Sequence, residues 1–169
     1  KNLTSLTKWV QSQFDPKLNW DDVKRIKDWW GGKLIIKGIM DPDDAKMAQK
    51  CGADALVVSN HGGRQLDGVN SSISMLPQIK KAISGIEVLF DGGISSGQDI
   101  LKAIALGAEG VMIGRSFVYG LSAKGKKGVK NALEILNKEL DMTMALCGRR
   151  DINDVGRDII KDCPFFEKN

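Results

Sequence analysis

The chain has 169 residues and a mass of 18.5 kDa, which is enough for one domain with a hydrophobic core and too little for two of ordinary size. Hydrophobic residues make up 42% of the chain and charged residues 27%, which fits a globular α/β protein and excludes a disordered or fibrous one. The 25 basic and 21 acidic residues leave a net charge of only +4, and the lysines are not interleaved with aromatic residues, so we expect no nucleic-acid partner.

The first predicted elements are a helix, a strand and a second helix. Asn19 can cap a helix that ends at the glycine pair beginning with Gly31. The apolar run LIIKG, residues 34–38, is typical of a strand buried on both faces. Asp41 can cap the next helix, which ends at Gly52.

Strands and helices then alternate along the rest of the chain. Three further strands are predicted at 55–59, 87–91 and 110–114. Pro77 is predicted to begin the helix that follows strand 55–59, and Gly107 to end the helix that follows strand 87–91. A longer helix follows strand 110–114 and ends at Gly148, and the basic run 124–130 is expected to be solvated at its start. A helix in each gap demands parallel strands joined by right-handed crossovers. Two architectures fit, a doubly wound sheet or part of a (β/α)8 TIM barrel, and because a full barrel needs about 250 residues this chain could supply only half.

Polar residues gather just past these strands, at the edge where parallel α/β proteins place their chemistry. The only histidine, His61, lies in the loop SNHGGRQLD, residues 59–67. An imidazole can take a proton near neutral pH, and the guanidinium of Arg64 can hold a carboxylate through two parallel hydrogen bonds. Together they predict a site for a small carboxylic acid, whereas His61 alone would equally fit a loop that uses its imidazole only for hydrogen bonding.

Lys37 and two glycine-rich turns complete this edge. Lys37 ends an apolar strand, so its ammonium either reaches solvent or contacts a cofactor. The turns DGGISSG, residues 91–97, and IGRS, residues 113–116, offer free backbone amides for a phosphate, which Arg115 would strengthen. Each turn singly is also typical of an ordinary connection, but the two with an arginine favour phosphate.

The segments LIIKGI, SNHGGRQLDG, FDGGI and GVMIGRSFVYGL resemble the carboxyl-terminal half of the FMN-dependent α-hydroxy-acid dehydrogenases and oxidases. The similarity is greatest to bacterial L-lactate dehydrogenases linked to quinone or cytochrome, and it runs from about Phe14 to Asp154. It implies strands five to eight of a (β/α)8 TIM barrel, with FMN as cofactor, and oxidation of L-lactate or a related 2-hydroxy acid to the 2-oxo acid.

The resemblance also implies a role for each matching residue. His61 corresponds to the catalytic base, Arg64 to the residue that binds the substrate carboxylate, and Lys37 to the lysine at the flavin's pyrimidine edge. The other implied FMN-binding residues are Ser59, Asp91, Gly92, Gly93, Ser95, Gly114 and Arg115.

The chain departs from the family in two ways. Ser95 stands where the family usually has an arginine on the FMN phosphate, and losing that contact could weaken binding by about 1.5–3 kcal/mol. The amino-terminal half, which supplies the aspartate that orients the histidine, is also missing. We therefore expect poor activity alone, and a partner that is either the missing half-barrel chain or another copy. The alternatives are a non-catalytic remnant and a phosphate-binding aldolase or isomerase with Lys37 as a Schiff-base lysine.

Other features concern location and metals. The sequence shows neither a signal peptide nor an apolar run of the roughly 18–20 residues that spans a bilayer, which predicts a cytoplasmic protein, while the resemblance adds peripheral contact with the inner membrane. No metal is expected, because metal-ligand spacing is lacking among Cys51, Cys147 and Cys163. Core packing rather than membrane contact is expected for Trp9, Trp20, Trp29 and Trp30. Because the chain begins at Lys1 rather than methionine, we expect residues 1–169 to be a single, incomplete domain.

Overall fold

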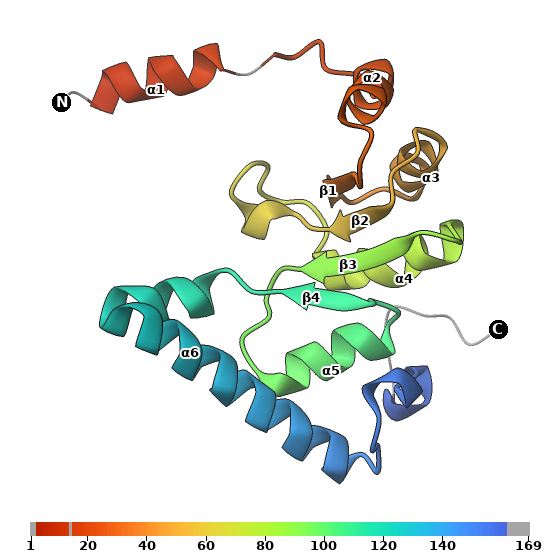
Figure 1. Ribbon diagram of the computed structural model, residues 1–169, viewed down its shortest axis with the longest axis vertical. Coiled ribbons are helices and arrows are strands. Elements are labelled where there is room, and N and C mark those ends of the chain that lie inside the picture. The colour runs from red at the N-terminus through yellow and green to blue at the C-terminus, as the bar shows by residue number, and fades with distance from the viewer. Residues whose placement is uncertain (1–2, 14, 162–169) are drawn as a thin grey trace.

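A four-stranded parallel sheet organises the computed structural model, which describes residues 3–13 and 15–161 (Figure 1). The strands are β1 (Ile35–Ile39), β2 (Ala55–Val58), β3 (Glu87–Asp91) and β4 (Gly110–Met112). They are hydrogen-bonded in chain order, β1-β2-β3-β4, and every neighbouring pair is parallel. The four predicted strands are confirmed, with ends that differ by no more than two residues.

Six α-helices accompany the strands within the described residues. They are α1 (Leu3–Ser12), α2 (Trp20–Trp30), α3 (Pro42–Lys50), α4 (Ser72–Ala82), α5 (Gly97–Ala105) and α6 (Arg115–Leu146). The predicted caps are confirmed, because Asn19 accepts backbone hydrogen bonds at the start of α2 and Asp41 does so at the start of α3. Short 3₁₀ turns cover His61–Gly63, Ile152–Asp154 and Arg157–Ile159. No described helix combines the length and the apolar character that crossing a membrane requires.

Two predicted helix starts are wrong. Helix α4 begins at Ser72 and contains Pro77, because burial of Leu76 and Ile79 against the sheet outweighs the one backbone hydrogen bond that proline removes. Helix α6 begins already at Arg115 and breaks at Lys124 and Gly125, so the predicted long helix is only its second part.

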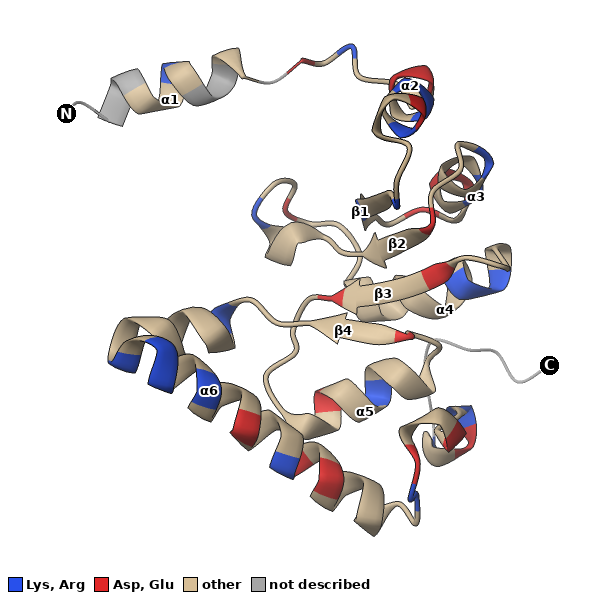
Figure 2. Cartoon of the chain, in the orientation of Figure 1, with Lys and Arg blue, Asp and Glu red and all other residues tan. Residues whose placement is uncertain are grey.

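The break in α6 brings two glycines together. A Cβ at Gly128 would overlap the carbonyl oxygen of Gly120, so only glycines let the two parts of the helix approach this closely. The basic run follows the break, and acidic residues alternate with basic ones further along the same helix (Figure 2). Lys130 pairs with Glu134 at 3.5 Å, which agrees with a solvated helix face.

The hydrophobic core lies between the sheet and the helices that follow its strands. Leu56, Val58, Val88 and Phe90 of the sheet are at most 1% exposed and share one cluster with the apolar residues of α3, α4 and α5. The alternate residues point to the other side, where Ile35 is 52% exposed and Met112 is 43% exposed. The described part of the chain therefore covers one face of the sheet, and on the other face it leaves Ile35 and Met112 of the outer strands exposed, although Ala55 and Val57 of β2 are only 3% and 2% exposed.

The tryptophans do not follow the core prediction. Trp9, Trp29 and Trp30 are 60%, 76% and 67% exposed, and only Trp20 packs against the core. The prediction is wrong for three of the four: α2, which carries Trp29 and Trp30, buries none of its residues, and Trp9 of α1 is exposed as well.

Candidate active site at the carboxyl ends of the strands

Three neighbouring strands bring Lys37, Ser59 and Asp91 into contact. The Lys37 Nζ atom lies 2.7 Å from Asp91 Oδ2 and donates a hydrogen bond of 2.9 Å to Ser59 Oγ. Lys37 belongs to β1, Ser59 follows β2 and Asp91 ends β3, so the strand order itself places them at one edge. Ser59 is only 1% exposed, whereas the Lys37 and Asp91 side chains are partly exposed, so the contact is partly buried.

His61 follows Ser59 directly and is tied to it. The His61 backbone N–H donates to Ser59 Oγ at 3.1 Å, so one hydroxyl oxygen joins the predicted base to the predicted flavin lysine. His61 has a φ of 54°, in the left-handed region that non-glycine residues seldom adopt. Asn60 stabilises this turn by accepting the Gly62 N–H at 3.0 Å.

Arg64 and the His61 imidazole are available to a ligand. Both residues are exposed, and Arg64 closes the 3₁₀ turn through its backbone N–H, which donates to the His61 carbonyl at 3.4 Å. Within residues 3–13 and 15–161 no carboxylate pairs with either side chain. The described residues thus include the predicted base but no acid to orient it.

The start of α5 does not offer the free amides that the turn DGGISSG predicted. Asp99 Oδ2 accepts hydrogen bonds from the backbone and hydroxyl groups of both Ser95 and Ser96, at 2.9–3.1 Å. Partial burial by itself raises the pKa of Asp99, but these hydrogen bonds outweigh it and the net pKa is lowered. Glu139 of α6 accepts the Gly97 N–H at 2.9 Å. Carboxylates therefore occupy the place where an anion was expected.

The glycines of the same turn have a steric role. Gly92 and Gly93 have φ values of 112° and 80°. A Cβ at Gly92 would overlap the hydroxyl of Ser72, a residue only 3% exposed, so a glycine is required there.

The start of α6 remains open. Gly114 is its cap residue, and within the described residues no side-chain cap hydrogen bond is made there. A Cβ at Gly114 would meet no atom within 4 Å, and Arg115 is exposed beside it. Of the two predicted sources of phosphate-binding amides, the first has its Ser95, Ser96 and Gly97 amides occupied by carboxylates, and the second carries no side-chain cap in the described structure.

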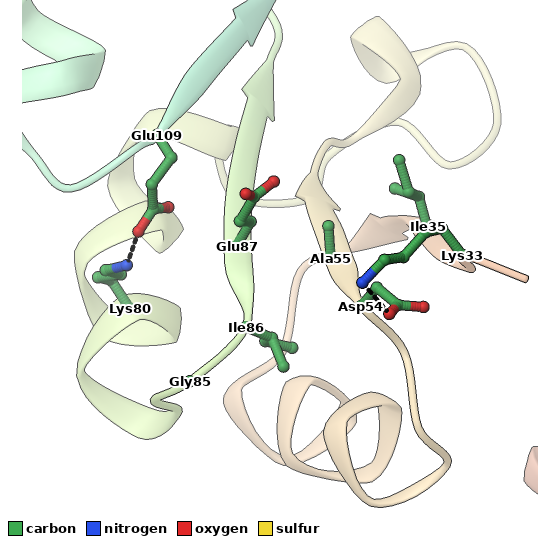
Figure 3. A pocket seen from close by; sticks show the side chains of 9 residues that line it. All are labelled: Lys33, Ile35, Asp54, Ala55, Lys80, Gly85, Ile86, Glu87 and Glu109. Atoms are coloured by element: carbon green, nitrogen blue, oxygen red, sulfur yellow. Dashed lines mark hydrogen bonds and ion pairs between the residues drawn. The ribbon is translucent and has the colours of Figure 1, made fainter.

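A second group of charges at the opposite edge was missed by the sequence reasoning. A cavity of about 640 Å³ lies there. It is lined by the residues labelled in Figure 3: Lys33, Ile35, Asp54, Ala55, Lys80, Gly85, Ile86, Glu87 and Glu109. Asp54 accepts hydrogen bonds from Lys27 Nζ, the Leu34 N–H and Lys33 Nζ, and these hold its pKa well below the usual range.

Glu109 makes the equivalent connection between β4 and β3. It pairs with Lys80 and accepts the Val88 N–H at 2.7 Å, just as Asp54 accepts the Leu34 N–H. An acidic residue directly before β2 and another before β4 is the signal that could have predicted them. Because these carboxylates fasten the amino ends of adjacent strands, we assign the group to stability rather than to chemistry.

The fold agrees with what comparison with known proteins finds. The family model described as FMN-dependent dehydrogenase matches residues 1–162. The chain belongs to this family. Membership leaves no support for the aldolase or isomerase alternative.

Relatives within the FMN-dependent dehydrogenases include two bacterial L-lactate dehydrogenases. The one from Stenotrophomonas maltophilia (strain R551-3) is 50% identical over 157 residues, which is 92% of this chain and 41% of that protein. The one from Caulobacter vibrioides (strain NA1000 / CB15N) is 49% identical over 155 residues, 91% of this chain and 40% of that protein. The chain thus spans about two fifths of the length of these relatives.

Solved structures show the same partial coverage. Mandelate oxidase matches with a TM-score of 0.86 and 41% identity over 92% of this chain and 46% of its own. A protein described as the monotopic membrane protein (S)-mandelate dehydrogenase matches with a TM-score of 0.88 and 38% identity, and the match covers 96% of this chain and 43% of that protein. The predicted fold is therefore confirmed as an α/β half barrel, the part of a TIM-barrel enzyme that these four parallel strands match.

Proposed function

We propose that this chain is the carboxyl-terminal part of an FMN-dependent enzyme that oxidises L-lactate, or a related 2-hydroxy acid, to the 2-oxo acid. The observation that carries the proposal is the connection of Lys37 to His61 through Ser59, in a chain 50% identical to an L-lactate dehydrogenase. The connection links the Lys37 ammonium, a cation that suits an electron-rich cofactor, with the His61 imidazole, a group that can accept a proton.

The proposed reaction divides between the substrate and three side chains. The 2-hydroxy acid loses the proton of its hydroxyl group and two electrons with the hydrogen on its α-carbon. The His61 imidazole takes the hydroxyl proton, and Arg64 holds the carboxylate through its guanidinium. When bound, FMN supplies the acceptor for the two electrons, and the Lys37 ammonium favours the negative charge that this places on the cofactor.

The residues present fit one side of FMN. Lys37 supplies a cation at the ends of the strands, and the open start of α6 with Arg115 supplies amides and a charge for the phosphate. Gly92 keeps the turn after β3 close to Ser72. Ser95 does not add to the phosphate site, because its N–H and hydroxyl are both directed at Asp99.

The activity needs a second part to cover the open face of the sheet. We propose that the family's amino-terminal barrel segment covers it, on a longer chain or a separate one, and supplies the carboxylate that orients His61. The exposed Ile35 and Met112 are then buried in the barrel. A second copy of the chain is the competing occupant.

Co-expression tests this proposal directly. The chain is produced together with the segment of the Stenotrophomonas L-lactate dehydrogenase that precedes its match. We expect a one-to-one complex that carries flavin absorbance and reduces a dye with L-lactate, and a His61→Ala complex that keeps the flavin but loses the reduction. A complex without flavin, or one with flavin and no dye reduction, contradicts the proposed function and favours the non-catalytic remnant. A chain that forms only its own dimer favours the second copy.

Membrane contact is a second proposal, favoured by the exposed tryptophans. Trp9 of α1 and Trp29 and Trp30 of α2 present large aromatic surfaces, and one relative is described as monotopic. We propose that these residues meet a membrane surface peripherally. Flotation with phosphatidylglycerol-containing vesicles should carry the chain upward, and a variant with all three tryptophans changed to serine should stay behind. Equal flotation of both would contradict the proposal.

A further inference from the structure

We propose that Gly38 is a positioning residue for His61, because the backbone of β1 at Gly38 forms the surface on which the imidazole rests. A Cβ at Gly38 would lie 2.9 Å from His61 Cε1 and 3.5 Å from Nδ1. The first distance is too short for a van der Waals contact and the second is an ordinary one, so the edge of the ring at Cε1 occupies the space that a side chain at Gly38 would need. The inference rests on the proposed function only in naming His61 as the base.

A bulge in β1 creates this surface. Lys37 is paired with Val57 and Ile39 with Val58, so Gly38 is an extra residue without a partner in β2. Its φ of 100° lies in the region that favours glycine. Lys37, the residue before the bulge, reaches Ser59 and Asp91 from the same strand end.

The backbone that carries the imidazole has little freedom to move away from an added methyl group. His61 already has a φ of 54°, and its N–H is held by the buried hydroxyl of Ser59. The next residue, Gly62, is held by the side chain of Asn60. A side chain at Gly38 must therefore turn the ring rather than shift the loop.

Two glycines separate this positioning role from simple backbone strain. Gly85 has a φ of 81°, and a Cβ there would meet no atom within 4 Å. Alanine at Gly38 or at Gly85 imposes left-handed strain, but only alanine at Gly38 also meets His61. Gly85→Ala is thus a matched control for Gly38→Ala.

Because His61 is the only histidine of the chain, its Hε1 proton gives a single imidazole signal in the NMR spectrum. We expect a nuclear Overhauser effect between His61 Hε1 and the Gly38 Hα protons. Gly38→Ala should move the Hε1 signal, whereas Gly85→Ala should leave it in place. An unchanged Hε1 signal in Gly38→Ala would overturn the proposal.

A double-mutant cycle with His61→Ala tests the contact through the free energy of unfolding, and it remains informative if Gly38→Ala folds poorly. Gly38→Ala should destabilise the chain less when His61 is already alanine, and Gly85→Ala should cost the same in both backgrounds. If Gly38→Ala folds only together with His61→Ala, the contact is confirmed. Equal costs of Gly38→Ala in both backgrounds would overturn it.

Activity of the co-expressed complex gives the last readout. A misplacement of about 1 Å can lower the rate by roughly 100-fold, so Gly38→Ala should reduce kcat strongly and leave the KM for L-lactate nearly unchanged. Unchanged kcat with a displaced imidazole would overturn the positioning role. The NMR and stability measurements use neither FMN nor lactate, so a complex without flavin would contradict the proposed function while leaving the Gly38 contact to its own test.

Discussion

Lys37 on β1 and Asp91 on β3 form an ion pair of 2.7 Å although the whole of β2 lies between their strands. Their side chains meet on the open face of the sheet, above Val57, and Ser59 joins them there. Three strand ends are therefore tied together by side chains in addition to the backbone ladder.

Lys37→Met should show how much this pair stabilises the chain. The Lys37 and Asp91 side chains are 36% and 20% exposed, so solvent screens the pair only in part. We expect the free energy of unfolding to fall by about 1–2 kcal/mol, because the Asp91 carboxylate and the Ser59 hydroxyl each lose a charged partner. Urea denaturation measures the change.

Asp91→Asn and the double variant close a cycle around the same pair. We expect a coupling energy of at least about 0.5 kcal/mol, and a control at the exposed pair of Lys46 with Asp43 should show no measurable coupling. Purely additive effects at Lys37 and Asp91 would contradict a stabilising pair.

The alternation of strands and helices was predictable because it depends on local patterns. Apolar runs bounded by Asp, Asn and Gly determine where strands and helices fall, and the parallel order then places Lys37, His61 and Asp91 at one edge. The contact of Gly38 with His61 was not predictable, because it depends on the bulge and on a left-handed residue in a separate loop.

At the start of α5, two local sequence patterns overlap, a glycine-rich turn and a helix capping box. The glycines of DGGISSG favoured a phosphate turn, yet Ser96 followed three residues later by Asp99 is also the pattern of a capping box, and this is what forms. The exposure of Trp29 and Trp30 could not be predicted, because periodicity indicates an apolar face without showing what covers it.

Ser96→Ala should destabilise the chain through this cap. The Ser96 hydroxyl accepts the Asp99 N–H at 3.2 Å and donates to its carboxylate at 2.9 Å. Loss of such an N-cap costs about 0.5–2 kcal/mol. Thermal unfolding should show the decrease, and Ser96→Thr, which keeps a hydroxyl that can accept from the amide and donate to the carboxylate, should destabilise less.

The contribution of Asp99 should depend on pH. Its pKa is lower in the folded chain than in the unfolded one, so ionised Asp99 stabilises the fold above the unfolded value of about 4. This stabilisation is lost as the pH falls through the folded pKa. The difference in unfolding free energy between the natural chain and Asp99→Asn should be largest near pH 7 and shrink below about pH 4. A difference independent of pH would contradict the assignment.

Gly97→Ala should disturb the packing of α5 on α6. A Cβ at Gly97 would overlap the backbone of Leu140 and Glu139, which cannot move aside as a flexible side chain could. We expect a loss of about 1–3 kcal/mol or more, although alanine is the better helix former. Gly114→Ala is the matched control for folding, because no atom lies within 4 Å of its Cβ and its φ is negative. Similar losses in the two variants would argue against the overlap.

Ser95→Arg should strengthen FMN binding if the proposed function is correct. The backbone N–H and the hydroxyl of Ser95 both donate hydrogen bonds to Asp99. An arginine side chain at this position could instead form a charge-assisted hydrogen bond with a phosphate near Arg115. In the co-expressed complex we expect affinity for FMN to rise roughly ten- to a hundredfold, the equivalent of about 1.5–3 kcal/mol. Quenching of flavin fluorescence measures it. Riboflavin, which lacks the phosphate, should bind the natural and Ser95→Arg complexes equally well, and a gain for riboflavin as large as that for FMN would show that the arginine acts elsewhere.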